Sequence, residues 1–166
     1  MNKLIDRLRD YWGESNTQLR PGVGDAEVAH FERENHVCLT RELRGYFQAV
    51  DGMTEDDSDR NLFHFFSLGE LGTVAREFRG RELRIAGIPE GSNPPDISNS
   101  KRWFIFCDYM IWSHYYAVEL GTERVEASPV VVFDGGIEVI ATSFSGFLKR
   151  YLDDYMSVLP GSNNPH

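Results

Sequence analysis

Apolar residues recur at three- and four-residue steps through the first third of the chain, the spacing of one face of an α-helix. Leu4, Leu8 and Trp12 follow this spacing in a first helix, and Val28 and Phe31 supply the buried stripe of a second. The early part of the chain is therefore predicted to be helical.

Two further helices have clear starting residues. Thr40 is placed as the N-cap of a short helix that buries Leu43, and Asp51-Gly52 ends that helix. Ser143 is placed as the N-cap of a last helix, in which Phe147 belongs to an apolar face at helical spacing. The last helix is expected to close the core.

Strand-like runs lie between these helices. Residues 62–66 form an aromatic run of strand length, and residues 67–78 look like a turn followed by a helical excursion. The later strand candidates, of which the last two are joined by a hairpin turn at 134–136, are residues 103–107, 112–120, 129–133 and 137–141. Four consecutive strands favour an antiparallel meander.

The predicted fold class is α+β, with an antiparallel sheet of about four to six strands packed against N-terminal helices and a C-terminal helix. Residues 1–159 are expected to form a single domain, and residues 160–166 a flexible tail. Proline and glycine make the segment between residues 87 and 100 the longest expected irregular connection.

Charge narrows the choice of partner. The 166 residues carry 17 Lys plus Arg against 26 Asp plus Glu, a formal net charge of −9. Such a chain repels phosphates, so we expect no nucleic-acid partner. A basic protein would be attracted, although many proteins are this acidic for solubility alone.

Three features of the sequence bear on the location of the protein. Early charges such as Lys3 and Asp6 exclude a signal-peptide core, no apolar run could span a membrane, and Cys38 and Cys107 resemble reduced core thiols. We expect a cytoplasmic protein without a membrane partner.

Several motif fragments fail on their spacing. Residues 57–61 begin like a calcium loop, but Leu62 stands where the sharp glycine belongs. Residues 22–24 lack the preceding strand of a dinucleotide loop, and residues 98–101 place a serine-lysine pair in a polar loop. We therefore expect no cofactor and no metal.

Two histidines leave one catalytic alternative open. His64 and His114 fall on strand candidates and could face one another near Asp108, as in a small hydrolase. A histidine among aromatic residues is more often a packing residue with one hydrogen bond.

A binding surface is the leading expectation. The acidic loop is either simply solvated or an anionic patch for a basic partner, and exposed Trp and Tyr are enriched in binding hot spots. Alternation along residues 112–120 places Tyr115, Ala117 and Glu119 on a face expected to meet solvent or a partner. The candidate partner-binding residues are Glu55, Asp56, Asp57, Asp59, Trp103, Asp108, Tyr109, Trp112, Tyr115 and Glu119.

Four short motifs follow one another in the first third of the chain: Phe31-Glu32, Leu39-Thr40, a leucine-rich stretch at residues 43–47, and Asp51-Gly52. Their order resembles the phenylalanine-glutamate pair, leucine-proline, leucine-rich helix and asparagine-glycine of the SUKH superfamily, which includes fungal cell-wall-synthesis regulators and bacterial immunity proteins. Thr40 replaces the usual proline and Asp51 the usual asparagine, and both replacements keep the local capping and turn chemistry. Later motifs are similar at residues 66–71, 114–118 and 141–148.

The resemblance covers about three quarters of the chain and implies a noncatalytic α+β domain that binds a protein. In bacterial relatives that partner is commonly a toxin, often a nuclease. We therefore expect an immunity protein that occludes a toxin domain with a basic surface. A housekeeping regulatory module, as in the fungal relatives, is the alternative.

Overall fold

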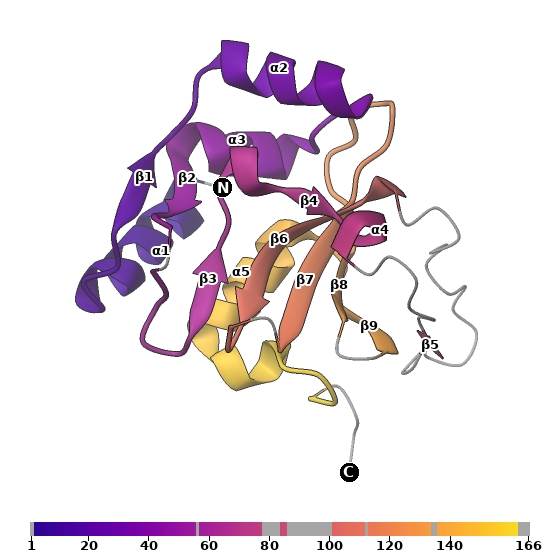
Figure 1. Cartoon of the computed structure of the whole chain (residues 1–166). Helices are drawn as coiled ribbons and strands as arrows, with labels where there is room; N and C mark the ends of the chain where they lie inside the picture. Colours follow the sequence, from indigo (N-terminus) through magenta and orange to yellow (C-terminus); the bar gives the residue numbers. More distant parts are fainter. Residues whose placement is uncertain are drawn as a thin grey trace.

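The computed structural model describes residues 2–55, 57–77, 84–85, 101–111, 113–133 and 136–162. Helices and strands form one α+β arrangement in which helices cover a mainly antiparallel sheet (Figure 1). The predicted fold class is confirmed. The expected irregular connection between residues 87 and 100 lies outside the described residues.

The N-terminal helices lie where the apolar spacing places them. They are α1 (Asn2–Glu14), α2 (Asp25–Asn35) and α3 (Arg41–Ala49). The Thr40 side chain accepts a hydrogen bond from the Leu43 backbone N–H at 3.2 Å, which satisfies an amide at the start of α3. The cap assignment of Thr40 is confirmed.

The main sheet has more strands than expected. Among the described residues it contains seven, in the order β3-β6-β7-β8-β9-β5, with β4 also paired to β6. The strands are β3 (Phe63–Phe65), β4 (Gly72–Thr73), β5 (Arg84–Ile85), β6 (Trp103–Tyr109), β7 (His114–Glu119), β8 (Val130–Phe133) and β9 (Gly136–Ala141). Strands β6 to β9 form the predicted antiparallel meander, while β5 pairs with β9 in parallel.

A second, two-stranded sheet was not predicted. Strand β1 (Leu19–Pro21) pairs with β2 (Val50–Met53), which begins directly after α3. The remaining elements are η1 (Leu68–Glu70), α4 (Val74–Glu77), α5 (Phe144–Asp153) and η3 (Tyr155–Val158). Among the described residues, no helix is long and apolar enough to cross a bilayer.

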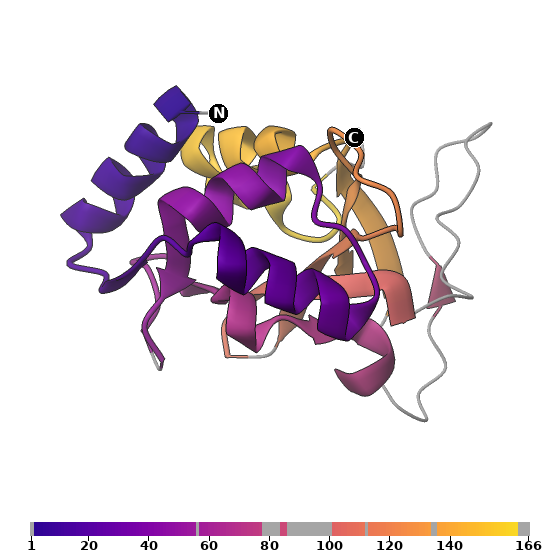
Figure 2. The same cartoon turned by 90° about the horizontal axis from the view of Figure 1, so that it is seen from above.

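The larger core lies between the sheet and the helices α1, α3 and α5, which Figure 2 shows grouped on the side opposite α4. Aromatic rings fill it: Phe106 packs edge-on against Phe147 with ring centroids 5.3 Å apart. The indole N–H of Trp12 donates to the Tyr151 hydroxyl at 3.0 Å, which joins α1 to α5. Burial of large rings is a main source of stability here.

The other sheet face is also buried, which corrects one expectation. Ala117 is 0 % exposed and packs in a second core cluster with Ile105, Val131 and Val74 of α4. The face of β7 that was expected to meet solvent or a partner is therefore covered near its middle. Tyr115, on the same face, is half-buried.

Candidate functional site

An open hollow of about 560 Å³ brings together acidic residues from distant parts of the chain. Its acidic lining comes from Glu55, Asp57, Glu70 and Asp108, and His64 lies among them. We call this set the acidic hollow. Glu55, Asp57 and Asp108 were candidate partner-binding residues from the sequence, and the structure brings these three to one place.

Strand register explains how two of these residues meet. His64 on β3 is paired with Asp108 on β6. Its neighbours Phe63 and Phe65 point into the larger core, so alternation sends His64 to the opposite face. Asp108 is buried at 4 % exposure, so its carboxylate belongs to the inner wall of the hollow.

Backbone contacts fix the acidic residues in position. Asp57 accepts hydrogen bonds from the backbone N–H groups of Gln18 at 2.5 Å and Ser58 at 2.8 Å. The His64 Nδ1–H donates to the Asp57 carbonyl oxygen at 2.5 Å, which also sets the tautomer of the ring. Glu70 accepts from the Ser67 backbone N–H at 2.8 Å in a capping box. The hollow is therefore preorganised.

Asp59 does not belong to this surface, although the sequence placed it there. It is 3 % exposed and accepts hydrogen bonds from the backbone N–H groups of Asn61 at 2.8 Å and Phe63 at 2.9 Å. The Tyr151 hydroxyl donates to its other oxygen. Burial raises the pKa of Asp59, and these hydrogen bonds oppose the shift. Asp59 is a structural carboxylate that shapes the loop before β3.

Trp103 is also unavailable to a partner. It is 0 % exposed and belongs to the second core cluster, because β6 is covered on both faces. Glu119 is half-buried beside Arg102, with 3.9 Å between its Oε1 and the arginine Nε. Asp56 and Trp112 lie outside the described residues.

The two histidines of the hydrolase alternative lie on opposite faces of the sheet. His114 stacks on Tyr109, with ring centroids 5.6 Å apart, and Tyr109 in turn packs against Phe63 on the larger core. His64 and Asp108 face the acidic hollow instead. The three residues therefore do not converge as the sequence allowed. In the part of the chain that the structure describes, no group of three or more His, Cys, Asp or Glu side chains could hold a metal ion.

Both cysteines are free thiols. Cys107 is fully buried in the larger core, and burial raises its pKa well above the ordinary value. Cys38 is half-buried, and its thiol donates to the Thr122 carbonyl oxygen at 3.3 Å. The buried thiol is chemically inert because the thiolate is the reactive form.

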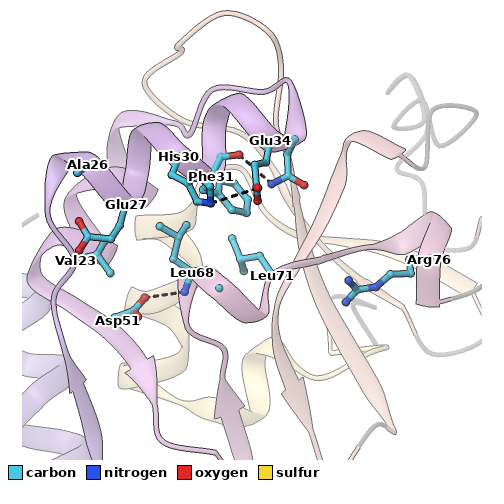
Figure 3. Close-up of a pocket in the computed structure, with 12 residues that line it drawn as sticks. Val23, Ala26, Glu27, His30, Phe31, Glu34, Asp51, Leu68, Leu71 and Arg76 are labelled. Atoms are coloured by element: carbon cyan, nitrogen blue, oxygen red, sulfur yellow. Dashed lines mark hydrogen bonds and ion pairs between the residues drawn. The ribbon is translucent and has the colours of Figure 1, made fainter.

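A second recess, of about 710 Å³, lies between α2 and the η1 segment (Figure 3). Leu68 and Leu71 form its apolar floor beneath Phe31. Asp51 lies at one end, where its Oδ1 accepts from the Leu68 backbone N–H at 2.7 Å. Desolvation raises the pKa of Asp51. The lining residues of this groove come from four separate segments (residues 23–35, Asp51, residues 68–71 and Arg76), so no local pattern in the sequence could identify it.

Three exposed apolar residues beside the acidic hollow were not predicted. Leu62, Met110 and Ile111 are 49 %, 47 % and 86 % exposed. Leu62 was counted in a strand, and the other two in the gap between strand candidates. Met110 and Ile111 stand in a strand connection, where polar residues are usual, and that is the one sequence signal that could have identified them.

No family model matches the chain, and a search of curated proteins finds no match. The residues that resemble SUKH motifs have structural contacts of their own. Glu32, for example, accepts from the Leu39 backbone N–H at 2.9 Å and pairs with Arg124 at 2.8 Å. One of these motifs, residues 66–71, also reaches the acidic hollow through Phe66 and Glu70.

Proposed function

We propose that this chain is a noncatalytic SUKH-type immunity protein that binds a bacterial toxin domain and occludes it in the cytoplasm. The observation that carries the proposal is the acidic hollow. Its carboxylates come from segments as far apart as Glu55 and Asp108, yet they line one open recess. The motif resemblance supplies the class of partner.

Charge supports a basic partner. The net charge of −9 creates a negative field around the molecule, and the hollow concentrates part of it in a concave site. A nuclease carries basic residues that hold nucleic-acid phosphates. An acidic surface that covers those residues would attract the enzyme and also block its substrate.

Co-expression tests this proposal. If a toxin gene lies directly beside the gene for this chain, its product is the partner, and growth is measured with the toxin alone and with both proteins. The expected result is restored growth together with a stable complex on size-exclusion chromatography. A toxin mutant without activity serves as the control for complex formation. Growth arrest without a complex would overturn the immunity proposal.

A second candidate function is a housekeeping interaction module. The groove between α2 and η1 favours it, because an apolar floor from Leu68 and Leu71 suits a peptide segment of a regulatory partner. The two functions differ in gene context: the immunity role requires an adjacent toxin gene, and the regulatory role does not.

A further inference from the structure

Three bulky apolar residues beside the acidic hollow have a left-handed backbone. Their φ values are 67° for Leu62, 53° for Met110 and 49° for Ile111. Glycine and asparagine are the usual residues in this region, and a β-branched residue such as isoleucine is a genuine outlier there. Such strained positions persist where the surrounding structure imposes them, and they cluster at functional sites.

Leu62, Met110 and Ile111 form what we call the apolar corner, in which hydrogen bonds fix Leu62 and Met110, and Ile111 follows Met110 in the turn. The Met110 backbone N–H donates to the Leu62 carbonyl oxygen at 2.9 Å, which ties the β6–β7 turn to the loop before β3. The Leu62 N–H donates to the Asp59 carbonyl oxygen at 3.0 Å, and the Ser113 hydroxyl donates to the Met110 carbonyl oxygen at 3.0 Å. The backbone of Leu62 and Met110 is therefore held in place, which lowers the entropy cost of binding.

The apolar corner holds much of the large apolar surface that the described residues expose. Its members are three of the five large apolar side chains that are exposed among the described residues. Leu62 and Ile111 also line the acidic hollow, so apolar and acidic surface are continuous there. A cluster of exposed apolar side chains next to a polar recess is typical of a protein interaction site.

Charge decides which occupant fits. A second copy would bring its own acidic hollow and another net charge of −9, so the two surfaces would repel each other. An anionic membrane surface would be repelled for the same reason. The nearest cation in sequence, Arg60, is held away over the Tyr11 ring, 4.5 Å from its centroid, and beside Glu14 at 3.3 Å. A partner that carries positive charge would complement the carboxylates of the hollow.

We propose that the apolar corner is the anchor of a docking surface for a basic protein, with Ile111 inserted into an apolar pocket of the partner and the acidic hollow facing its cations. This deepens the proposed function and relies on it only for the identity of the partner. Hot spots of this form combine one buried anchor with a rim of complementary charge.

The variant Ile111→Asn separates binding from folding. Asparagine tolerates the left-handed backbone, so the variant should melt about 2–4 °C higher, because this backbone strain is removed. It should at the same time bind less well. The matched control is Val125→Asn, which removes an apolar side chain that is 46 % exposed and has no left-handed backbone.

Nuclear magnetic resonance with short peptides tests the surface without the natural partner. The probe is the blocked peptide Lys-Arg-Leu-Phe-Arg-Lys, compared with Glu-Asp-Leu-Phe-Asp-Glu and Lys-Arg-Ser-Gln-Arg-Lys. We expect methyl signals of Leu62, Met110 and Ile111 to shift with the first peptide alone. The Ile111→Asn variant should bind it at least about tenfold more weakly, a loss of about 1.4 kcal/mol, while Val125→Asn binds normally.

Three outcomes would overturn the docking surface: shifts centred on the groove between α2 and η1, equal binding by Ile111→Asn, or concentration-dependent self-association through the same methyl groups. The peptide result does not depend on the toxin. Normal peptide binding without growth rescue would therefore reject the immunity role and leave the docking surface supported. Growth rescue without peptide binding would reject the docking surface alone.

Discussion

Asp59 offers the sharpest test of the contacts that shape the candidate site. Its carboxylate is 3 % exposed and accepts from three donors: the backbone N–H groups of Asn61 and Phe63, and the Tyr151 hydroxyl. Asp59→Ala leaves these three buried donors without their acceptor. An unsatisfied buried donor costs about 1–3 kcal/mol, and water entering the space left by the side chain recovers part of this. We expect a loss of about 3–5 kcal/mol in the free energy of unfolding.

The milder variant Asp59→Asn keeps an oxygen for the two backbone amides. In asparagine an NH2 group replaces the second carboxylate oxygen. This group donates hydrogen bonds and does not accept them, so the Tyr151 O–H is left without an acceptor. We expect a loss of about 1–2 kcal/mol. The control is Asp153→Asn, because the ion pair of Asp153 with Arg7 joins two side chains that are each 51 % exposed. That change should cost less than about 1 kcal/mol.

The raised pKa of Asp59 also predicts that the free energy of unfolding depends on pH. Burial raises the native pKa of Asp59 above its ordinary value of 3.8, so the folded state binds this proton more tightly than the unfolded chain does. Its contribution to the free energy of unfolding therefore decreases as pH rises from 3.8 through the raised native pKa, and is constant above it. Asp59→Asn should remove this slope, while the similar slope from Asp51, whose pKa is also raised, stays in both proteins.

Urea denaturation monitored by tryptophan fluorescence measures each of these quantities. A loss of less than about 1 kcal/mol for Asp59→Ala would contradict this role of Asp59, because the three donors would then have found other partners. A difference in stability between wild type and Asp59→Asn that does not change between acidic and neutral pH would contradict the raised pKa.

The remaining predictions concern the hollow, the backbone and the buried thiol. Joint replacement of Glu55 with Gln and Asp57 with Asn should slow association with the toxin domain several-fold at low salt and little at high salt; an unchanged low-salt rate would exclude steering by the hollow. Gly52→Ala should cost at least about 2 kcal/mol in urea denaturation, because φ is +70° and a Cβ would lie 2.5 Å from the Phe66 carbonyl oxygen, whereas Gly69→Ala meets nothing within 4 Å; equal effects would contradict this. Cys107 should resist thiol reagents until the protein unfolds, and rapid native labelling would contradict its burial.

Local signals in the sequence accounted for much of the fold. Thr40 and Ser143 cap α3 and α5 as predicted, the latter by accepting from the Gly146 backbone N–H at 2.9 Å. These effects act over three or four residues, so they are visible without the tertiary structure. The meander was predictable for the same reason: each strand has its own apolar run, and short connections favour antiparallel neighbours.

What sequence reasoning missed depends on contacts between distant segments. Strand β2 has no pattern of its own, and Asp51-Gly52 looked like a helix end because its partner β1 lies some thirty residues earlier. Trp103 looked like a surface aromatic because the cover on its side of β6 includes the short α4.

Only part of the candidate site was predictable from the sequence, for similar reasons. The acidic residues Glu55 and Asp57 stood out by composition, but nothing local distinguished them from Asp59, which the Tyr151 hydroxyl holds inside. The apolar corner was not predicted, because a leucine or isoleucine in the sequence usually indicates a core position, and only the place of Met110 and Ile111 in a strand connection pointed to the surface. Its left-handed backbone is imposed by the junction of the β3 loop with the β6–β7 turn.

Hydrogen exchange on the complex with the adjacent toxin domain would test the central claim, that this chain neutralises a toxin through the acidic hollow and the apolar corner. Amide exchange is compared by mass spectrometry for the free and the bound protein. We expect slower exchange on binding in peptides that cover residues 57–66 and 106–111, with α2 unchanged. Protection confined to α2, or no protection at all with toxin present, would contradict this claim.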